Sequence, residues 1–427
     1  MTEPLADGAQ TDTAATASTT TRPHPALDRW QSADGRLVIN GWDVERLAAR
    51  VGATPFYAYD RAKISARVDH LRDLLPDAVR LHYAVKANPM PAVVHHLAGL
   101  VDGFDVASAD EMQTALDTGF EPLSVGFAGP GKTDAELAQA AAAGIVVELE
   151  SAGEMQRLAH AAQTLGCRVP VAVRVNPDFK VRGSGMHMGG GASQFGVDAE
   201  AVPALFEAMA DLPLDFRGFH IFAGSQNLSV DALIQAERAI ADTALALAEH
   251  APAPVRHLNI GGGFGIPYFP KDLPLDTGPL KAALADIVGD LTARLPEAHV
   301  IVELGRYLVG EAGVYIARVI DKKVSRGQTY LVTDGGLHHQ LAATGNFGQG
   351  IRRNYPLAIA NRFDAPADAS AQVVGCLCTP IDLLGDKVAL PEAQVGDLVA
   401  IFQSGAYGPS ASPKDFLSHP HPREVLV

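Results

Sequence analysis

The chain has 427 residues, of which 47% are hydrophobic and 19% are charged, and its formal net charge is −15. This is the composition of an ordinary globular protein, and no apolar run approaches the roughly 18 residues that a membrane-spanning helix needs. The acidic balance argues against nucleic acid or a membrane surface as a partner, because both reward basic residues. A small-molecule substrate or a protein partner agrees better with this charge.

The chain begins with a segment rich in Thr and Ala that lacks the basic and apolar parts of a signal peptide. We expect residues 1–28 to form a disordered tail. The strand-like segment from Gly35 to Asn40 comes next. Because it precedes the first repeated unit, we expect it to join a sheet at the C-terminal end of the chain, within an N-terminal segment of residues 36–58.

From about residue 80 to 308 the sequence repeats one unit, a short apolar run followed by a segment with helical periodicity, and we expect the domain built from these units to span residues 59–310. The eight runs are Leu81 to Val85, Gly103 to Ala107, Ser124 to Ala128, Ile145 to Leu149, Val171 to Val175, Gly218 to Ala223, His257 to Ile260 and Val300 to Leu304. Eight alternations of strand and helix are what a closed parallel (β/α)₈ barrel requires. The sequence therefore predicts an α/β protein with a barrel of this type.

Three of the expected helices begin with the pattern of a capping box, a hydroxyl residue followed three positions later by a glutamate. The pairs are Ser108 with Glu111, Thr133 with Glu136, and Ser151 with Glu154. The connection from Asn176 to Gly196 is longer than the others and holds a group of glycines at positions 183, 185, 189, 190 and 191. Such a loop on a barrel is typical of a lid or a binding loop.

From residue 311 to 427 the pattern changes to apolar strands separated by turns. The clearest are Val314 to Ile320, Thr329 to Val332, Gln372 to Val374 and Asp397 to Phe402. They predict a second, mostly β domain.

The residues that end the barrel strands are chemically reactive, and in barrels of this type the active groups lie at those ends. The set contains Lys86, Asp105, Ser108, Arg174, Asn176, His220, Ser225, Gly261, Gly262, Gly263, Glu303 and Arg306. Lys86 ends its strand just before Asn88 and Pro89. Burial would lower the pKa of a lysine and free its amine to attack a carbonyl group. A rim lysine that pairs with a carboxylate is the alternative, and the local sequence does not separate the two.

The glycine triplet, Arg306 and Ser225 offer backbone, guanidinium and hydroxyl donors that suit a phosphate. An aldehyde-bearing phosphate that a lysine captures is pyridoxal 5′-phosphate. At these residues the chain resembles the fold-type III pyridoxal-phosphate decarboxylases, the group of diaminopimelate and ornithine decarboxylases, from about residue 36 to the C-terminus. The matching motifs are Tyr83 to Asn88, Phe104 to Ser108, Gly224 to Gln226, Gly261 to Gly265, Glu303 to Arg306, Cys378 with Asp382, and Gly405 to Tyr407.

The resemblance implies a homodimer with shared active sites and assigns roles to single residues. Lys86 would hold pyridoxal phosphate as a Schiff base, and Glu303 would keep the pyridine nitrogen protonated. The phosphate would be bound by Ser225, Gly261, Gly262, Gly263, Arg306 and Tyr407. Cys378 would reach the partner's site and donate a proton to the product. Taken singly, Cys378 also fits a buried thiol, Tyr407 a core aromatic and His220 a satisfied interior histidine.

Departures from the family pattern bear on the substrate. Phe222 stands where the relatives stack a histidine on the cofactor ring, and Thr379 stands where both relatives have an acid that contacts the substrate's far end. Ala342 and Asn346 occupy the places of an arginine and a tyrosine that bind the distal carboxylate of diaminopimelate. A buried substrate charge needs a partner, so neither diaminopimelate nor ornithine fits well.

The segment from Gly335 to Pro356 is instead similar to the exosortase-associated subgroup and to the butirosin-type enzyme that acts on a glutamyl group held on a carrier protein. We therefore expect an amino-acid substrate, free or attached to an acyl carrier protein. Its candidate contacts are Arg174, Thr379, Asp382, Arg352 and Arg353. Arg352 and Arg353 with Lys322 and Lys323 would form a basic dock, although a solvated surface explains the same charges.

Three other functions compete with decarboxylation. An amino-acid racemase would use the same cofactor without releasing CO₂, and a noncatalytic pyridoxal-phosphate regulator would not need Cys378 and Tyr407. A metal hydrolase built on His338 and His339 is disfavoured, because the barrel mouth lacks a carboxylate and histidine set with ligand spacing, and we expect no metal.

Overall fold

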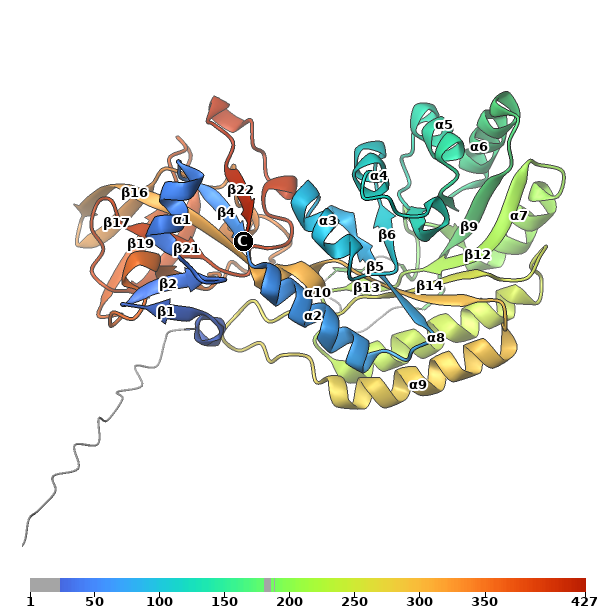
Figure 1. The fold of residues 1–427 in the computed structure, drawn as a ribbon, viewed down its shortest axis with the longest axis horizontal. Coiled ribbons are helices and arrows are strands. Elements are labelled where there is room, and N and C mark those ends of the chain that lie inside the picture. Colours follow the sequence, from blue (N-terminus) through green and yellow to red (C-terminus); the bar gives the residue numbers. More distant parts are fainter. Residues whose placement is uncertain (1–23, 180–185, 188) are drawn as a thin grey trace, which may run out of the picture.

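The computed structural model describes residues 24–179, 186–187 and 189–427. Figure 1 shows two parts, a barrel wrapped by helices and a mostly β part that contains both ends of the described chain. Within the described chain, no helix combines the length and the apolar character needed to cross a lipid bilayer.

Eight parallel strands form the barrel, and each overlaps one of the eight predicted apolar runs. They are β5 (Val79–Ala84), β6 (Gly103–Val106), β7 (Val125–Phe127), β8 (Val146–Leu149), β9 (Val169–Asn176), β12 (Leu214–Ile221), β14 (His257–Gly262) and β15 (His299–Leu304). The barrel closes because β15 pairs with β5 and β8 pairs with β9. Strands covered on both faces read as continuous apolar runs, and every residue of β9 is buried. The predicted barrel is confirmed.

Helices cover the outside of the barrel (Figure 1). They are α2 (Arg61–Leu74), α3 (Pro91–Ala98), α4 (Ala109–Leu116), α5 (Asp134–Ala143), α6 (Ala152–Leu165), α7 (Val202–Met209), α8 (Val230–Ala248) and α9 (Thr277–Arg294), with the short α10 (Arg306–Val309) after the last strand. The three predicted N-caps are in place, because the hydroxyl oxygens of Ser108, Thr133 and Ser151 all accept a backbone N–H.

The reciprocal half of the capping box is complete at Thr133 alone among these three. Glu136 accepts the Thr133 backbone N–H at 2.9 Å. By contrast, the Glu111 carboxylate accepts from the backbone N–H of Ala107, and the Glu154 carboxylate accepts from that of Glu150. These two glutamates therefore each bind the backbone N–H one residue before the N-cap.

The β part is organised around the long strand β16 (Gly313–Ser325). The other strands of its sheet are β4 (Phe56–Tyr59), β17 (Gln328–Thr333), β18 (Leu357–Ile359), β19 (Ala369–Val374), β20 (Leu383–Leu390), β21 (Leu398–Ile401) and β22 (Arg423–Leu426). The predicted C-terminal strands are therefore present. Strand β4, which precedes the barrel, pairs with both β16 and β22, so both ends of the chain contribute to this sheet.

The strand predicted from Gly35 to Asn40 does not join that sheet, and this expectation was wrong. It forms β2 (Arg36–Ile39) in a separate three-stranded sheet with β1 (Gln31–Ala33) and β3 (Trp42–Asp43). Asn40 and Gly41 have positive φ and turn the chain straight back, so β2 pairs with its sequence neighbours. The helix α1 (Val44–Val51) then leads the chain to β4.

Most of the predicted disordered tail, residues 1–23, lies outside the described residues. Its last part differs from the prediction, because Pro25–Arg29 form the 3-10 helix η1. Ala26 and Leu27 in this helix are buried, and the ring of Trp30 packs on Phe402. Apolar burial fixes this segment where composition suggested disorder.

A contact between the two parts lies beside the barrel mouth. The backbone N–H of Tyr407 donates to the carbonyl of Ala87 at 2.8 Å, and the Asn88 amide donates to the carbonyl of Gly405 at 3.0 Å. The loop of the β part that holds Tyr407 is thereby fixed next to Lys86.

Candidate active site

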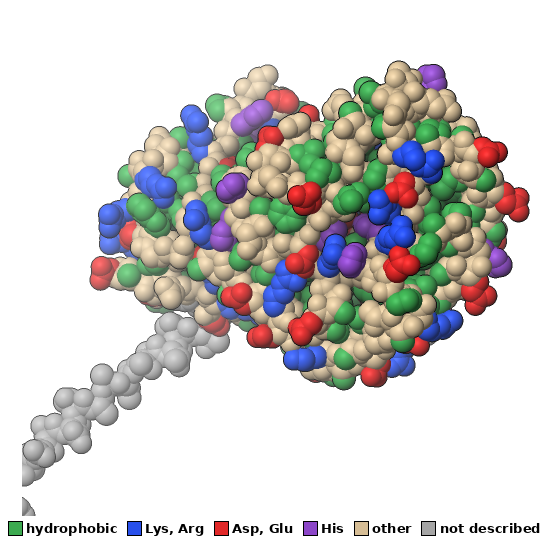
Figure 2. Space-filling model, turned by 45° about the vertical axis from the view of Figure 1, so that its right-hand side comes forward, with side chains coloured by type: hydrophobic (Ala, Val, Ile, Leu, Met, Phe, Trp, Pro, Cys, Tyr) green, Lys and Arg blue, Asp and Glu red, His purple; other side chains and the backbone are tan. Residues whose placement is uncertain are grey.

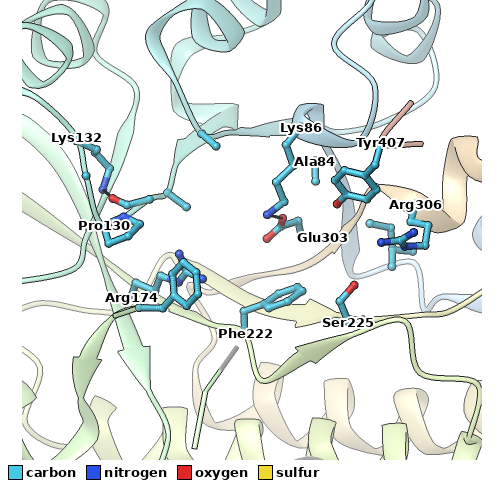
Figure 3. A pocket seen from close by; sticks show the side chains of 18 of the residues that line it. Ala84, Lys86, Pro130, Lys132, Arg174, Phe222, Ser225, Glu303, Arg306 and Tyr407 are labelled. Carbon is cyan, nitrogen blue, oxygen red and sulfur yellow. Dashed lines mark hydrogen bonds and ion pairs between the residues drawn. The ribbon is translucent and has the colours of Figure 1, made fainter. Parts of the chain in front are cut away.

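A cavity of about 730 Å³ opens at the carboxyl ends of the barrel strands (Figure 3). Lys86 and Glu303 lie near its middle and Phe222 forms its floor in this view. Ser225, Arg306 and Tyr407 gather at one end, whereas Arg174 and Pro130 lie at the other. Six of the twelve residues predicted from the strand ends line this cavity, namely Lys86, Arg174, Ser225, Gly263, Glu303 and Arg306.

Lys86 belongs to the 3-10 helix η2 (Val85–Ala87), directly after β5. Its Nζ lies 3.5 Å from Oε1 of Glu303 and 5.8 Å from the centre of the Phe222 ring. Burial alone would lower the pKa of Lys86, as we expected from the sequence. That expectation was wrong for the net effect, because Glu303 together with the smaller contributions of Tyr407 and Asp105 outweighs burial and raises the pKa. In this arrangement Lys86 is a rim lysine paired with a carboxylate and also faces the open cavity.

Glu303 is the first member of a buried chain of alternating charges. Its Oε2 lies 3.3 Å from Nε2 of His220, and Nδ1 of His220 contacts Oε2 of Glu148. Burial would lower the pKa of His220, but the two carboxylates outweigh it and raise the pKa to about 9. Burial would likewise neutralise Glu303, but Lys86 and His220 hold the pKa of Glu303 well below its usual value. Glu303 is therefore a carboxylate at neutral pH.

Asp105 lies deeper in the barrel and behaves in the opposite way. Burial and the nearby carboxylates of Glu303 and Glu148 raise the pKa of Asp105 well above its usual value. Its Oδ2 lies 3.2 Å from Nδ1 of His82, whose pKa burial lowers to about 4. Gly126 makes room here, because a Cβ at this position would come within 2.7 Å of Asp105 and 2.9 Å of Glu148. The barrel interior thus contains a neutral acid, Asp105, below the charged carboxylate of Glu303.

The end of the cavity formed by Ser225, Arg306 and Tyr407 fits a phosphate. The guanidinium of Arg306 donates from one terminal nitrogen to the hydroxyl of Tyr268 at 2.8 Å and lies 4.6 Å from the centre of the Tyr407 ring. Its Nε is buried and has no hydrogen-bond partner within the described part of the chain. Burying an N–H donor without an acceptor costs free energy, and a phosphate oxygen would be a suitable acceptor for the N–H of Nε.

The glycine triplet serves mainly to shape the backbone. Of the three, Gly263 lines the cavity of the described structure, whereas Gly261 and Gly262 end strand β14. A Cβ on Gly262 would come within 2.8 Å of the Glu303 carbonyl, and one on Gly263 would come within 2.4 Å of the Gly224 carbonyl. Side chains are excluded because β14 must approach β15 and the Gly224–Ser225 strand closely, and this brings Ser225 beside Gly263.

Arg174 reaches the opposite end of the cavity from strand β9. Its guanidinium donates to Oε1 of Glu150 at 2.6 Å and lies 4.8 Å from the centre of the Phe195 ring. Glu150 also accepts the backbone N–H groups of Gly129 and Gly196. Arg174 is therefore held by a carboxylate that anchors two neighbouring loops. The predicted loop from Asn176 to Gly196 lies partly outside the described residues, including Gly183 and Gly185.

The other predicted substrate residues lie away from the cavity of their own chain. Asp382 is buried and accepts the backbone N–H groups of Leu337 at 2.6 Å and Leu377 at 2.8 Å. It braces the loop that carries Cys378 and Thr379. Cys378 itself is exposed, so the alternative that it is a buried thiol is wrong.

The proposed basic dock is largely committed to other contacts. The Arg352 guanidinium donates to the carbonyls of Thr344 and Leu383, so it acts as a loop brace. Arg353 lies 3.5 Å from the centre of the Phe269 ring, and Lys322 pairs with Glu392 at 3.1 Å. Figure 2 shows acidic and basic side chains interspersed on the face that it draws. The structure gives Arg352 a structural role in place of the predicted contact with substrate.

Sequence reasoning missed several residues that shape this site. Glu148 and Glu150 come from neighbouring positions on one strand and its following loop, and they hold His220 and Arg174. Tyr268 and Phe264 come from the loop after β14, and Phe195 comes from the loop after β9. The acidic Glu148-Leu149-Glu150 pattern at the end of an apolar strand was a visible signal, because charges in a buried strand need partners.

Three comparisons with known proteins bear on this geometry. Residues 61–310 match the family of the pyridoxal-dependent decarboxylases, through its pyridoxal binding domain. The chain is 37% identical over 383 residues to the L-glutamyl-[BtrI acyl-carrier protein] decarboxylase of Niallia circulans, covering 87% of this chain and 88% of that relative. It is 32% identical over 401 residues to the diaminopimelate decarboxylase of Aquifex aeolicus, covering 92% and 91%. A crystal structure of diaminopimelate decarboxylase from M. jannaschii with L-lysine superposes with a TM-score of 0.82 at 25% identity, covering 94% of this chain and 93% of that one.

A barrel whose mouth pairs a lysine with a carboxylate beside a phosphate-binding end is the arrangement of a pyridoxal-phosphate enzyme. The chain belongs to the pyridoxal-dependent decarboxylase family, and it is a lyase that uses pyridoxal 5′-phosphate to decarboxylate an amino acid, free or carrier-bound. The predicted family, fold, enzyme class and cofactor are confirmed.

Proposed function

We propose that the substrate is an L-amino acid whose side-chain end carries no charge, as when that end is attached to an acyl carrier protein. The observation that carries this proposal is the state of the charges around the cavity. Lys86 pairs with Glu303, Arg174 pairs with Glu150, and Arg306 serves the phosphate end. The remaining two charged residues of the lining are Lys132 and Glu136. The Lys132 ammonium donates to two backbone carbonyls, and the Glu136 carboxylate accepts a backbone N–H at the start of α5. Among the lining residues described, no charge is left for a distal ammonium or carboxylate.

The substrate's far end would meet neutral residues elsewhere as well. Thr379 follows Cys378, Ala342 is buried, and the Asn346 amide donates to the hydroxyl of Thr344. The relative from Niallia circulans, which is named for a glutamyl group on a carrier protein, supports the same conclusion.

In this proposal, each residue of the cavity has a role that follows from its position. Lys86 would hold the cofactor's aldehyde through its amine, and Glu303 would keep a proton on the pyridine nitrogen, because a carboxylate favours the cationic ring. Ser225, Gly263, Arg306 and Tyr407 would bind the phosphate, and Phe222 would offer a flat apolar face to the ring. When bound, pyridoxal phosphate supplies the electron sink that makes loss of CO₂ feasible.

His220 positions Glu303. Held between Glu148 and Glu303, it keeps the Glu303 carboxylate both charged and aimed at the cavity. The chain also pairs with a second copy in this proposal, and the exposed Cys378 of each copy enters the other copy's cavity to deliver a proton. The chain has three cysteines, too few for a disulfide framework, and this favours a reducing compartment and supports a cytoplasmic location.

The test compares α-carboxyl-labelled substrates on the full-length enzyme loaded with cofactor. A glutamyl group attached to a carrier protein through its side-chain carboxyl should release labelled CO₂ much faster than free glutamate, diaminopimelate or ornithine. Faster release from free diaminopimelate would overturn the proposal. Retention of the label with inversion at the α-carbon would identify a racemase.

A matched pair of variants isolates the neutral far end. Thr379→Glu adds a carboxylate where a distal ammonium would bind, whereas Thr379→Val keeps the volume and the neutrality. We expect Thr379→Glu to raise kcat/KM for free diaminopimelate or ornithine at least about tenfold, equivalent to about 1.4 kcal/mol, and Thr379→Val to leave it unchanged.

A further inference from the structure

Three residues from separate loops of the β part converge outside the active-site cavity. His338 follows β17, Cys376 follows β19, and His419 precedes β22. One ligand atom from each, a ring nitrogen or the thiol sulfur, lies within 4.8 Å of the other two. Nδ1 of His419 is 3.9 Å from the Cys376 sulfur, and the rings of His338 and His419 are 5.3 Å apart between centres.

His338 is the most unusual member of this cluster. It is completely buried, and neither of its ring nitrogens has a hydrogen-bond partner within the described residues. Leaving a buried nitrogen without a partner costs about 1–3 kcal/mol, and a neutral imidazole has one donor and one acceptor. The adjacent His339 has both partners, with Nδ1 3.2 Å from the Tyr315 hydroxyl and Nε2 2.9 Å from the Pro420 carbonyl.

The cluster has the chemistry of a transition-metal site. Imidazole and thiolate are the ligands that Zn²⁺ prefers, at about 2.0 Å and 2.3 Å, and tetrahedral geometry then separates the ligand atoms by roughly 3.3–3.6 Å. The ligand atoms now lie within 4.8 Å of one another, so the three side chains would move closer together on binding.

We propose that His338, Cys376 and His419 bind one Zn²⁺ ion, with water as the fourth ligand. On binding, the Cys376 thiol releases its proton to solvent and its sulfur bonds to the metal, while each histidine uses a ring nitrogen. The site does not depend on the proposed reaction, because these residues lie outside the active-site cavity.

The metal would connect three loops that are far apart in sequence. Asp382 already ties two of them through the backbone of Leu337 and Leu377. Cys376 lies two residues before Cys378, so the ion would fix the loop that presents Cys378. This consequence for Cys378 rests on the proposed function, whereas metal binding itself does not.

The experiment titrates Co²⁺ and then Zn²⁺ into full-length enzyme stripped with a chelator. We expect one Co²⁺ per chain, a thiolate-to-cobalt charge-transfer band, and displacement of that band by Zn²⁺. Bound Zn²⁺ should also protect Cys376 from alkylation, as mapped by mass spectrometry of peptides, while Cys167 and Cys378 remain reactive. Both readouts are independent of activity, so they separate failure of this proposal from failure of the proposed function.

Matched variants locate the site. Cys376→Ser should abolish the charge-transfer band, and His419→Ala should weaken binding more than about 100-fold. Cys167→Ser and His421→Ala are the controls, since His421 lies in the same segment but pairs with Asp415. His338→Ala adds a third ligand test. Binding that survives Cys376→Ser and His419→Ala, or that is lost equally in His421→Ala, overturns the proposal, as does failure of the wild-type enzyme to bind Co²⁺.

Discussion

The barrel mouth and the loop cluster of the β part both bury histidines, yet they hold them in opposite states. His220 lies between the carboxylates of Glu148 and Glu303, and its pKa rises to about 9. His338 lies against two other histidines, His339 and His419, and burial lowers its pKa to about 4. Burial therefore lowers the pKa of a histidine unless adjacent carboxylates outweigh it, as they do at His220.

The comparison also separates two ways of stabilising buried polar groups. In the barrel, opposite charges alternate from Lys86 through Glu303 and His220 to Glu148, so each charge lies beside one of opposite sign. In the cluster of His338, Cys376 and His419, the nitrogens of His338 lack partners in the described structure. In the barrel, the charged carboxylate of Glu303 faces the cofactor cavity. In the cluster, the nitrogens of His338 would gain a partner if a ligand bound.

The largest expected effect comes from removing Lys86, which pairs with Glu303 at the open end of the barrel network. Lys86→Ala should lower kcat by several orders of magnitude, because the cofactor loses its covalent attachment. Borohydride reduction followed by peptide mapping should label Lys86 in the wild type and leave Lys132 unlabelled, since that ammonium is bound by two carbonyls and Glu154. An unlabelled Lys86 in cofactor-loaded enzyme would contradict the assignment.

Glu303→Gln should have the next largest effect. The loss of the carboxylate removes the partner of the pyridine nitrogen, and we expect kcat to fall about 10²–10³-fold, as for other charge-stabilising groups. Glu136→Gln is the control, because Glu136 also lines the cavity but serves as the cap of α5. Its loss should reduce thermal stability by about 1 kcal/mol while kcat changes little. Equal effects on kcat from the two variants would show that Glu303 has no special role.

His220→Gln tests the charged histidine through the pH dependence of unfolding. The folded-state pKa of about 9 exceeds the usual 6.5, so the stabilisation is complete below pH 6.5 and disappears as the pH rises through 9. At 1.36 kcal/mol per pKa unit, the stability that His220 contributes should fall by about 3 kcal/mol over this range. Urea unfolding at pH 6 and pH 9.5 should show this loss in the wild type and a flatter profile in the variant. Parallel profiles would mean that His220 is neutral.

The smallest effect is expected for His338→Leu in chelator-treated enzyme. Because this substitution removes a buried group that lacks partners, stability should be unchanged or rise by up to about 1 kcal/mol. Added Zn²⁺ should then raise the melting temperature of the wild type but not that of the variant. A destabilisation near 3 kcal/mol without metal would show that His338 has polar partners, as His220 does, and would remove the contrast between the two regions.

Much of the fold could be predicted because its signals are local. The eight apolar runs, the N-caps at Ser108, Thr133 and Ser151, and the reactive residues at the strand ends all lie within short windows of sequence. The strand at Gly35 to Asn40 was recognised as a strand but assigned to the wrong sheet, because pairing depends on the turn at Asn40 and Gly41 and on where the chain goes next. The pKa of Lys86 was expected to fall and instead rises, because Glu303 is 217 positions away in sequence and adjacent in space.

The sequence by itself determined the barrel, the family, the cofactor and the residues at the strand ends, since periodicity and motif spacing are properties of neighbours along the chain. Only the tertiary structure decided which charges face each other: that His220 lies between two carboxylates, that Glu150 holds Arg174, that Arg352 braces a loop, and that His338, Cys376 and His419 meet. The physical reason is that electrostatic energy and metal coordination depend on distances of a few ångströms between side chains, and folding alone sets those distances.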